Sequence, residues 1–307
     1  MSESAIPKTD LAPHGTPVIL PVSAWNGMDS GLNWLWHGFS TRHGGVSEVY
    51  SPAKTPTELN LGFTAADSGE HVRENRLRLV EAVTGSRETP LITVRQIHSN
   101  LAVVVRSAAS PPVAKNGAEN GAESGVGSGV ANQHCDGDGL MTSQAGVLIG
   151  IQTADCIPVL VADPVRHVVA AFHAGWRGTV ERIVEHGIAQ MTAEYGSRPS
   201  ELIAAIGPGI GPCCYLVGDE VVSRFRANFA YAEELFSESS AAASPLGLPR
   251  LNLVEANRRQ LMAAGLPSES IEVVGGCTSC HPELFYSHRA SGGHAGRMMS
   301  VIGIRPS

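Results

Sequence analysis

The chain has 307 residues, of which 43% are hydrophobic and 17% are charged, and its formal net charge is −7. This composition is typical of a globular protein that buries one large core or two small ones. The acidic balance excludes the basic surface that binds nucleic acid or an anionic membrane, so an anionic ligand must be held by a few placed arginines.

The N-terminal residues 1–15, MSESAIPKTDLAPHG, show no basic region followed by an apolar one, as a secretory signal would. They have little to bury, so we expect a disordered tail followed by a single domain over residues 16–307. No run of the chain reaches the roughly 20 apolar residues of a membrane span. We therefore expect a cytoplasmic protein without membrane contact, and no particular oligomeric state is predicted.

The first predicted elements follow one another between residues 72 and 107. Apolar spacing predicts a helix over residues 72–85 that stops at Gly85. Residues 91–99 and 101–107 are rich in β-branched side chains and predict two strands joined by a polar turn, with His98 near the end of the first. Residues 107–133 contain almost no large apolar side chain and predict a disordered surface insertion.

Strands and helices alternate over the second half of the chain. Near-continuous apolar runs predict strands covered on both faces at residues 147–153, 156–163 and 167–172, and a further strand at 201–207. Helices are predicted over residues 179–196, 218–229 and 252–265. This order indicates the α/β (α+β) class, with a single layered domain in which helices flank a mixed β-sheet.

Three candidate metal ligands, His98, Cys156 and His173, lie where predicted strands end. Two imidazoles and one thiolate are the donor set of a catalytic zinc site with an open fourth position, at which zinc lowers the pKa of water to about 7. The residues are too far apart in sequence for a zinc finger, so they can meet only through the fold. Each of them alone also fits an ordinary structural residue.

The segment FHAGWRGT (172–179) follows a predicted strand directly. With Thr179 as the predicted N-cap of the next helix, free N–H groups and the Arg177 guanidinium would form a clamp for phosphate or carboxylate. Trp176 fits a buried structural plug equally well.

Other cysteine and glycine motifs allow several interpretations. CTSCH (277–281) matches a c-type haem attachment pattern, a redox dithiol or two structural cysteines, and the last is favoured. IGPGIGP (206–212) departs from the dinucleotide-binding pattern and predicts a rigid loop near a ligand. Cys213 and Cys214 are predicted to be one buried and one pocket-edge thiol without a disulfide.

Several motifs together resemble one family. They are FSTRHGGVS, NLGFTAADSGEHVRENR, VRQIHS, CDGDGLMT, QTADCIPVL, HAGWRGT, IGPGIGPCCYLVGDEV, CTSC with FYSHR, and GRMMSVIGI. In this order, from about residue 36 to 304, they are similar to the YfiH family. It is also called the laccase-domain or multicopper polyphenol oxidase family, and it includes the peptidoglycan editing factor PgeF and the mammalian protein FAMIN. The insertion at 107–133, CDGDGL and FYSHR depart from its usual pattern.

The resemblance implies a single α/β domain in which His98, Cys156 and His173 bind Zn²⁺. It also implies purine nucleosides and phosphate as substrates, through deamination of adenosine and phosphorolysis of adenosine, inosine, guanosine or methylthioadenosine. Candidate holders of phosphate or ribose, chosen from their chemistry, are Arg42, Arg177 and Arg289. For proton transfer during attack on adenine C6, Asp155 and Asp138 are the candidate catalytic groups, although Asp155 fits the cap of a turn equally well.

Other activities remain open at this stage. Cys156 activated by His173 would make a cysteine hydrolase, and a cysteine- or zinc-dependent amidohydrolase could edit peptidoglycan precursors. A copper polyphenol oxidase is less favoured, because copper centres use closely spaced histidine pairs and the sequence has no His-x-His pair. A binding module without enzymatic activity is the last alternative.

Overall fold

The structure, a computed structural model, describes residues 15–27, 30–51, 57–107, 135–238 and 247–306. Apart from Gly15 and Ser107, the predicted tail at 1–15 and the predicted insertion at 107–133 lie outside the described residues. No helix in the described ranges is long and apolar enough to cross a membrane.

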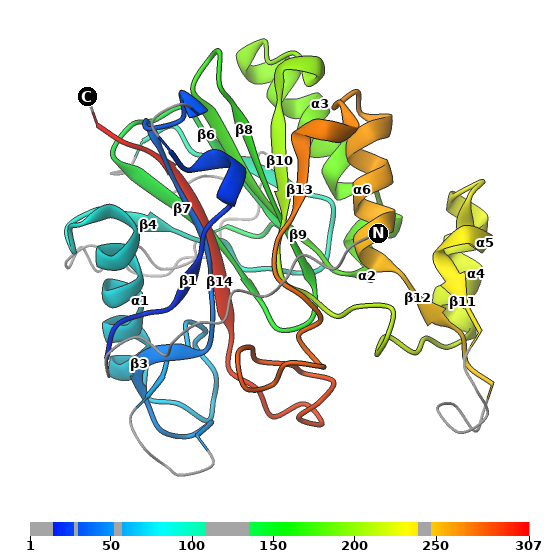
Figure 1. Ribbon diagram of the computed structural model, residues 1–307, viewed down its shortest axis with the longest axis horizontal. Coiled ribbons are helices and arrows are strands. Elements are labelled where there is room, and N and C mark those ends of the chain that lie inside the picture. Colours follow the sequence, from blue (N-terminus) through cyan, green and yellow to red (C-terminus); the bar gives the residue numbers. More distant parts are fainter. Residues whose placement is uncertain (1–14, 28–29, 52–56, 108–134, 239–246, 307) are drawn as a thin grey trace.

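Two mixed sheets pack face to face, with helices covering their outer surfaces (Figure 1). The first sheet has the order β1 (Ile19–Leu20), β2 (Leu35–Ser40), β14 (Met298–Ile304), β7 (Val147–Thr153) and β4 (Leu91–Ile92). The second has the order β13 (Ile271–Val273), β10 (Ile203–Ile206), β8 (Ile157–Asp163), β9 (Val168–Ala174), β6 (Gly139–Thr142) and β5 (Ala102–Val104). The remaining strands are β3 (His43–Ser47) and the pair β11 (Phe236–Ser237) and β12 (Arg250–Leu251).

Helix α1 (Gly69–Thr84) covers the first sheet, while α3 (Ile183–Tyr195) and α6 (Leu253–Ala263) cover the second (Figure 1). The other helices are α2 (Trp176–Val180), α4 (Asp219–Asn228) and α5 (Ala232–Leu235). Short 3₁₀ turns lie at Ser23–Trp25, Pro199–Glu201 and Ser268–Ser270. The predicted α/β class with a mixed sheet is confirmed, but the strands form two large sheets rather than one.

The apolar strands of the second sheet are buried on both faces. In β8, Val159 and Val161 pack toward the helices, whereas Leu160 and Ala162 pack into the core between the two sheets. This alternation is the ordinary two-residue period of a strand. Because both faces are covered, every residue of β8 and β9 is buried, which explains the near-continuous apolar runs in the sequence.

The predicted strands at 91–99 and 101–107 do not form a hairpin. β4 pairs in parallel with β7 in the first sheet, whereas β5 pairs in parallel with β6 in the second. The chain therefore passes from one sheet to the other between Ile92 and Ala102, and His98 lies on this crossing. Cys156 lies on a second crossing, between β7 and β8, so the two-sheet arrangement itself brings these residues together.

The helix predicted over residues 179–196 begins earlier and is interrupted. Gly175 is the N-cap of α2, and Arg182 with φ of 61° separates α2 from α3. Thr179 is therefore inside a helix, fully buried, and its hydroxyl accepts a hydrogen bond from the Asn257 amide at 3.1 Å. The predicted anion clamp with Thr179 as N-cap is wrong, because a buried polar group inside a helix offers no free N–H to a ligand.

Candidate functional site

His98, Cys156 and His173 converge in the structure. One possible ligand atom from each lies within 4.8 Å of the other two, and the two imidazole rings pack edge to face with centroids 5.0 Å apart. His173 follows Val169 and Ala171 onto the face of β9 that looks toward the other sheet. The three donors thus come from two crossings and one strand end, which together form one metal-ligating group.

Asp138 holds two of these ligands in place. Its carboxylate is fully buried and accepts a hydrogen bond from His173 Nδ1 at 2.8 Å. It also accepts from the backbone N–H groups of Ile97, His98 and Ser99 at 3.2, 3.0 and 2.6 Å, and from the Ser99 hydroxyl at 2.8 Å. Because Nδ1 of His173 is engaged by Asp138, its Nε2 is the nitrogen left for a metal, as in carboxylate–histidine–zinc triads.

Asp138 also explains the backbone of His98, which has φ of 61°. A non-glycine residue in this left-handed region is strained, and the strain persists only where the surroundings impose it. Hydrogen bonds from three consecutive N–H groups to one carboxylate provide that constraint. The hydrogen bonds of Asp138 to His173 and Ser99 offset the effect of burial and hold its pKa below the usual value.

Gly175 gives the three ligands the space they need. A Cβ atom at this position would lie 3.0 Å from Cys156 Sγ and 3.2 Å from His98 Cδ2. Its backbone is extended, with φ of −68°, so the glycine is explained by this close approach and not by an unusual dihedral angle. The glycine of the HAGWRG motif is thus part of the metal-ligating group.

The pair of Cys156 and His173 is ionised in the absence of metal. Burial alone would raise the pKa of Cys156, but His173 and His98 more than offset it and lower the pKa to about 6. Burial alone would lower the pKa of His173, but Cys156 and Asp138 raise it to about 9. At neutral pH the sulfur is therefore a thiolate, the form that binds a metal or acts as a nucleophile.

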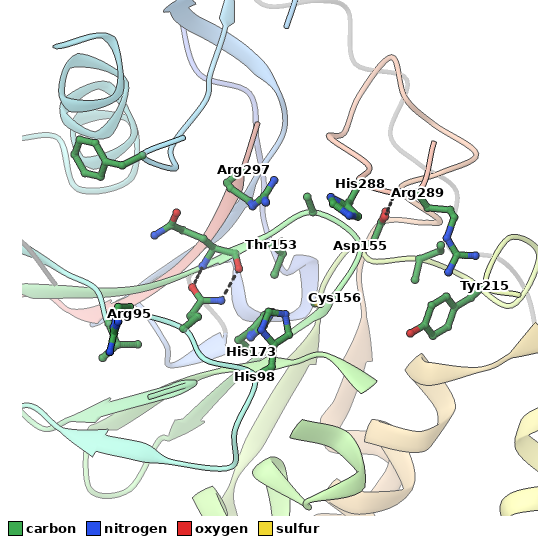
Figure 2. A pocket seen from close by; sticks show the side chains of 16 residues that line it. Arg95, His98, Thr153, Asp155, Cys156, His173, Tyr215, His288, Arg289 and Arg297 are labelled. Carbon is green, nitrogen blue, oxygen red and sulfur yellow. Dashed lines mark hydrogen bonds between the residues drawn. The ribbon is translucent and has the colours of Figure 1, made fainter. Parts of the chain in front are cut away.

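The metal-ligating group opens into a pocket of about 550 Å³ (Figure 2). This volume is in the range of small-molecule sites. Besides the three ligands, the pocket is lined by Phe63, Val94, Arg95, Gln96, Gln152, Thr153, Ala154, Asp155, Ile210, Tyr215, His288, Arg289 and Arg297. Its walls are therefore apolar and aromatic in part, with three arginines and one carboxylate among the described residues.

The side chains of Gln96 and the backbone of Gln152 form a reciprocal pair, drawn as dashed lines in Figure 2. Gln96 Nε2 donates to the Gln152 carbonyl at 2.8 Å, and the Gln152 N–H donates to Gln96 Oε1 at 2.7 Å. This side chain replaces a ladder partner beside β7 and fixes the crossing that carries His98. Sequence reasoning missed it because the contact joins residues 56 positions apart.

Asp155 lies in the pocket wall next to Cys156, with φ of 89°. Its Oδ1 accepts from the Thr278 hydroxyl at 2.6 Å, and its Oδ2 accepts from the Arg289 N–H at 2.7 Å. The carboxylate thus joins the β7–β8 crossing to the loop that follows β13. Asp138, in contrast, lies behind His173 and does not line the pocket.

The three arginines predicted from sequence have different surroundings. Arg289 lines the pocket, stacks over Tyr215 and donates to the Leu216 carbonyl. Arg177 is exposed and stacks on the half-buried Trp176 at 4.2 Å, outside the pocket lining.

Arg42 is the third of these arginines, and it lies outside the main pocket. Its guanidinium is used by Glu58 at 2.7 Å and by the carbonyls of Pro282 and Tyr50. The prediction that Arg42 faces the substrate does not fit this position, because its donors already hold the loops together.

Arg297, Tyr215 and His288 line the pocket and were missed from sequence. Burial, with the nearby Cys156 and Asp155, raises the pKa of Tyr215, so its hydroxyl remains a hydrogen-bond donor. Arg297 begins the GRMMSVIGI motif at the start of β14, and Tyr215 follows Cys214 in IGPGIGPCCY. The signal for both was present as motif membership, but a pocket position depends on the fold.

Replacing Gly175 by alanine is expected to weaken metal binding about 10- to 100-fold, because relieving an overpacked contact costs about 1–3 kcal/mol. Metal affinity by competition with a chelator measures this. Gly218→Ala is the matched control, since Gly218 is also an extended helix N-cap but its Cβ would meet nothing within 4 Å. Equal affinity in both variants would show that Gly175 does not confine the ligands.

A comparison with known families gives one match over most of the chain. Residues 36–305 match the family described as multi-copper polyphenol oxidoreductase laccase. A solved structure of the Bacillus licheniformis hypothetical protein YfiH superposes with a TM-score of 0.75 and 32% sequence identity, over 89% of this chain and 95% of that one. Fold and sequence therefore agree on the same relatives.

Two curated relatives carry names that describe an activity. Purine nucleoside phosphorylase YlmD of Bacillus subtilis is 33% identical over 290 residues, covering 94% of this chain and 96% of that protein. Adenosine deaminase RL5 of an unknown prokaryotic organism is 36% identical over 165 residues, covering 54% of this chain and 61% of that protein. These names are compatible with the chemistry of the pocket.

Proposed function

This chain belongs to the multi-copper polyphenol oxidoreductase laccase family, and we propose that it acts as a zinc-dependent purine nucleoside enzyme, a phosphorylase that also deaminates adenosine. The observation that carries this proposal is the convergence of His98, Cys156 and His173 at a pocket of about 550 Å³ that also contains arginines. The relatives named purine nucleoside phosphorylase and adenosine deaminase support the substrate class.

The donor set fits zinc better than copper. Two imidazoles and one thiolate leave a coordination position open, as in catalytic zinc sites, whereas multicopper centres use more histidines. Bound Zn²⁺ would act as a Lewis acid and lower the pKa of a water molecule at the open position. Within the protein, Asp138 orients His173, and Gly175 leaves room for the sulfur.

The pocket walls fit the two parts of a nucleoside and a phosphate. Phe63, Val94 and Tyr215 offer apolar and aromatic surface to a purine. Arg289 and Arg297 offer positive charge to phosphate, which must be held in line with the anomeric carbon. In phosphorolysis a phosphate oxygen forms the new bond to that carbon as its bond to the purine nitrogen breaks, and the purine leaves with the electron pair.

Asp155 is the group that we assign to proton transfer. Among the described residues it is the one carboxylate that lines the pocket, and it lies next to Cys156 in the chain. Its two hydrogen bonds from Thr278 and Arg289 stabilise the ionised form, which can accept a proton and return it to a leaving group. Asp138 is instead a positioning residue, because its oxygens face His173 and the backbone.

The test is a chromatographic assay of adenosine, inosine and guanosine with the zinc-loaded protein. We expect free base and ribose 1-phosphate only when phosphate is present, and inosine with ammonia from adenosine whether or not phosphate is present. The absence of products from all three nucleosides would refute the proposed function.

Arg289→Gln is expected to raise KM for phosphate about 10- to 100-fold, the equivalent of the roughly 1.5–3 kcal/mol of a hydrogen bond to a charged group. Ammonia release from adenosine, measured in the same preparation, should change much less. Arg177→Gln is the matched control, because Arg177 stacks on Trp176 outside the pocket. If both variants keep the original KM for phosphate, Arg289 does not bind it.

A second candidate function is supported by the ionised pair of Cys156 and His173. A thiolate with a pKa of about 6 beside an imidazolium is also the arrangement of a cysteine hydrolase. Such an enzyme could cleave an amide in a peptidoglycan precursor. It would remain active after chelation, whereas nucleoside turnover should be lost. All six cysteines are free thiols, which supports a reducing cytoplasmic location for either enzyme.

A further inference from the structure

Four cysteines gather at a second place, separate from the pocket ligands. Every pair of their Sγ atoms lies within 4.8 Å, and we call them the four-cysteine cluster: Cys213, Cys214, Cys277 and Cys280. Cys280 Sγ is 3.4 Å from Cys213 Sγ and 3.4 Å from Cys214 Sγ. These distances exceed the roughly 2.05 Å of a disulfide, and all four are free cysteines.

The sheet topology brings the two halves of the cluster together. β10 and β13 are parallel neighbours, so the loops that follow them leave the same edge of the second sheet. The loop after β10 carries the adjacent pair CC, and the loop after β13 carries the CTSC motif. A hydrogen bond of 3.0 Å from the Thr278 N–H to the Gly209 carbonyl holds the loops side by side.

The sulfur positions match a tetrahedral metal site. Four thiolates at about 2.3 Å from Zn²⁺ have sulfur–sulfur distances of about 3.8 Å, within the observed limit of 4.8 Å. The Gly211 N–H donates to Cys277 Sγ at 3.2 Å, the kind of bond that stabilises a coordinating thiolate. A Cβ on Gly211 would lie 3.2 Å from Cys213 Sγ, so the glycine allows the loop to wrap closely around the sulfurs.

We propose that the four-cysteine cluster binds one Zn²⁺ as a closed structural site. Four sulfur ligands fill the coordination sphere, so this ion would leave no position for water or substrate. Two exposed and two half-buried thiols clustered without a metal would bring together groups that oxidise easily. The proposal is independent of the proposed function, since none of the four cysteines lines the pocket.

The structural consequence concerns the wall of the pocket. Tyr215, which lines the pocket, directly follows Cys214, and Thr278, which holds Asp155 at 2.6 Å, directly follows Cys277. Zinc in the four-cysteine cluster would therefore tie together the two loops that position Tyr215 and Asp155. Metal binding of this kind contributes directly to folding free energy, because the site does not exist in the unfolded chain.

The test counts zinc per chain by mass spectrometry in protein prepared anaerobically with zinc. We expect about two zinc ions in the wild type, about one in His173→Ala, about one in Cys280→Ser, and none in the double variant. Cys135→Ser, which changes the one remaining cysteine outside both groups, should keep two. Retention of the same zinc content in Cys280→Ser as in the wild type would overturn the proposal.

Cobalt substitution provides a second measurement that does not depend on the folding of Cys280→Ser. In His173→Ala, Co²⁺ should give the intense thiolate-to-metal and tetrahedral ligand-field absorption of a four-sulfur site, and zinc should displace it. His173→Ala that binds neither zinc nor cobalt, that contains iron in place of zinc, or that forms a disulfide within the cluster despite zinc excess would contradict the assignment.

Discussion

His173→Ala is expected to remove the metal from the pocket and to lower kcat/KM for nucleosides more than about 100-fold. The loss should exceed the 10- to 100-fold cost of removing a residue that only supports a ligand. His173 is one of three donors within 4.8 Å, and its removal leaves His98 and Cys156 with too few bonds to hold the ion. Cys156→Ala should have the same effect on metal content and activity.

Both variants should remain folded, because neither side chain belongs to the large apolar clusters. Circular dichroism and the unfolding midpoint check this. His186→Ala on the exposed surface of α3 is the control for the histidine, and Cys135→Ala is the control for the cysteine. Full nucleoside turnover in His173→Ala with no bound metal would exclude the metal-dependent mechanism.

Asp138→Asn is expected to weaken metal binding about 10- to 100-fold, as is typical when a carboxylate behind a histidine ligand is lost. It should also lower the free energy of unfolding by about 3–5 kcal/mol, the cost of breaking a buried pair. The amide would place N–H donors opposite some of the five groups that donate to Asp138, and these groups would lose their acceptor.

Saturating zinc distinguishes positioning from direct catalysis at Asp138. A positioning residue acts through the ligands, so excess zinc should restore most of kcat in folded Asp138→Asn. If kcat stays low at saturating zinc, Asp138 takes part in proton transfer itself. Asp136→Asn is the matched control, because Asp136 lies on the surface two residues away, pairs with Arg95, and should have little effect on metal affinity.

Much of the fold follows from local patterns in the sequence. Apolar runs predicted β7, β8 and β9 almost to the residue, since strands buried on both faces need no polar alternation. Gly85 and Gly196 were correctly predicted as helix ends, and both adopt the left-handed conformation that glycine allows.

What local patterns could not give is the path of the chain between the sheets. The sequence after β4 is compatible with a hairpin, and only the pairing of β4 with β7 and of β5 with β6 shows that it crosses instead. The helix break at Arg182 has no glycine or proline to announce it. Both features depend on contacts between residues far apart in sequence.

The candidate site shows the same division. The donor types and their places near strand ends predicted the group of His98, Cys156 and His173. The role of Asp138 was not predictable, because its acceptor geometry depends on the crossing that carries His98. Arg42 was assigned to the substrate from its charge alone, but the fold places Glu58 beside it. The four-cysteine cluster likewise requires the parallel pairing of β10 and β13.

The most direct measurement is the position of zinc in crystals of the zinc-loaded protein, from diffraction data collected on both sides of the zinc absorption edge. We expect an anomalous peak about 2.0–2.3 Å from a ring nitrogen of His98, a ring nitrogen of His173 and Cys156 Sγ. The absence of zinc between these three residues in fully loaded crystals would contradict a metal-dependent active site in this pocket.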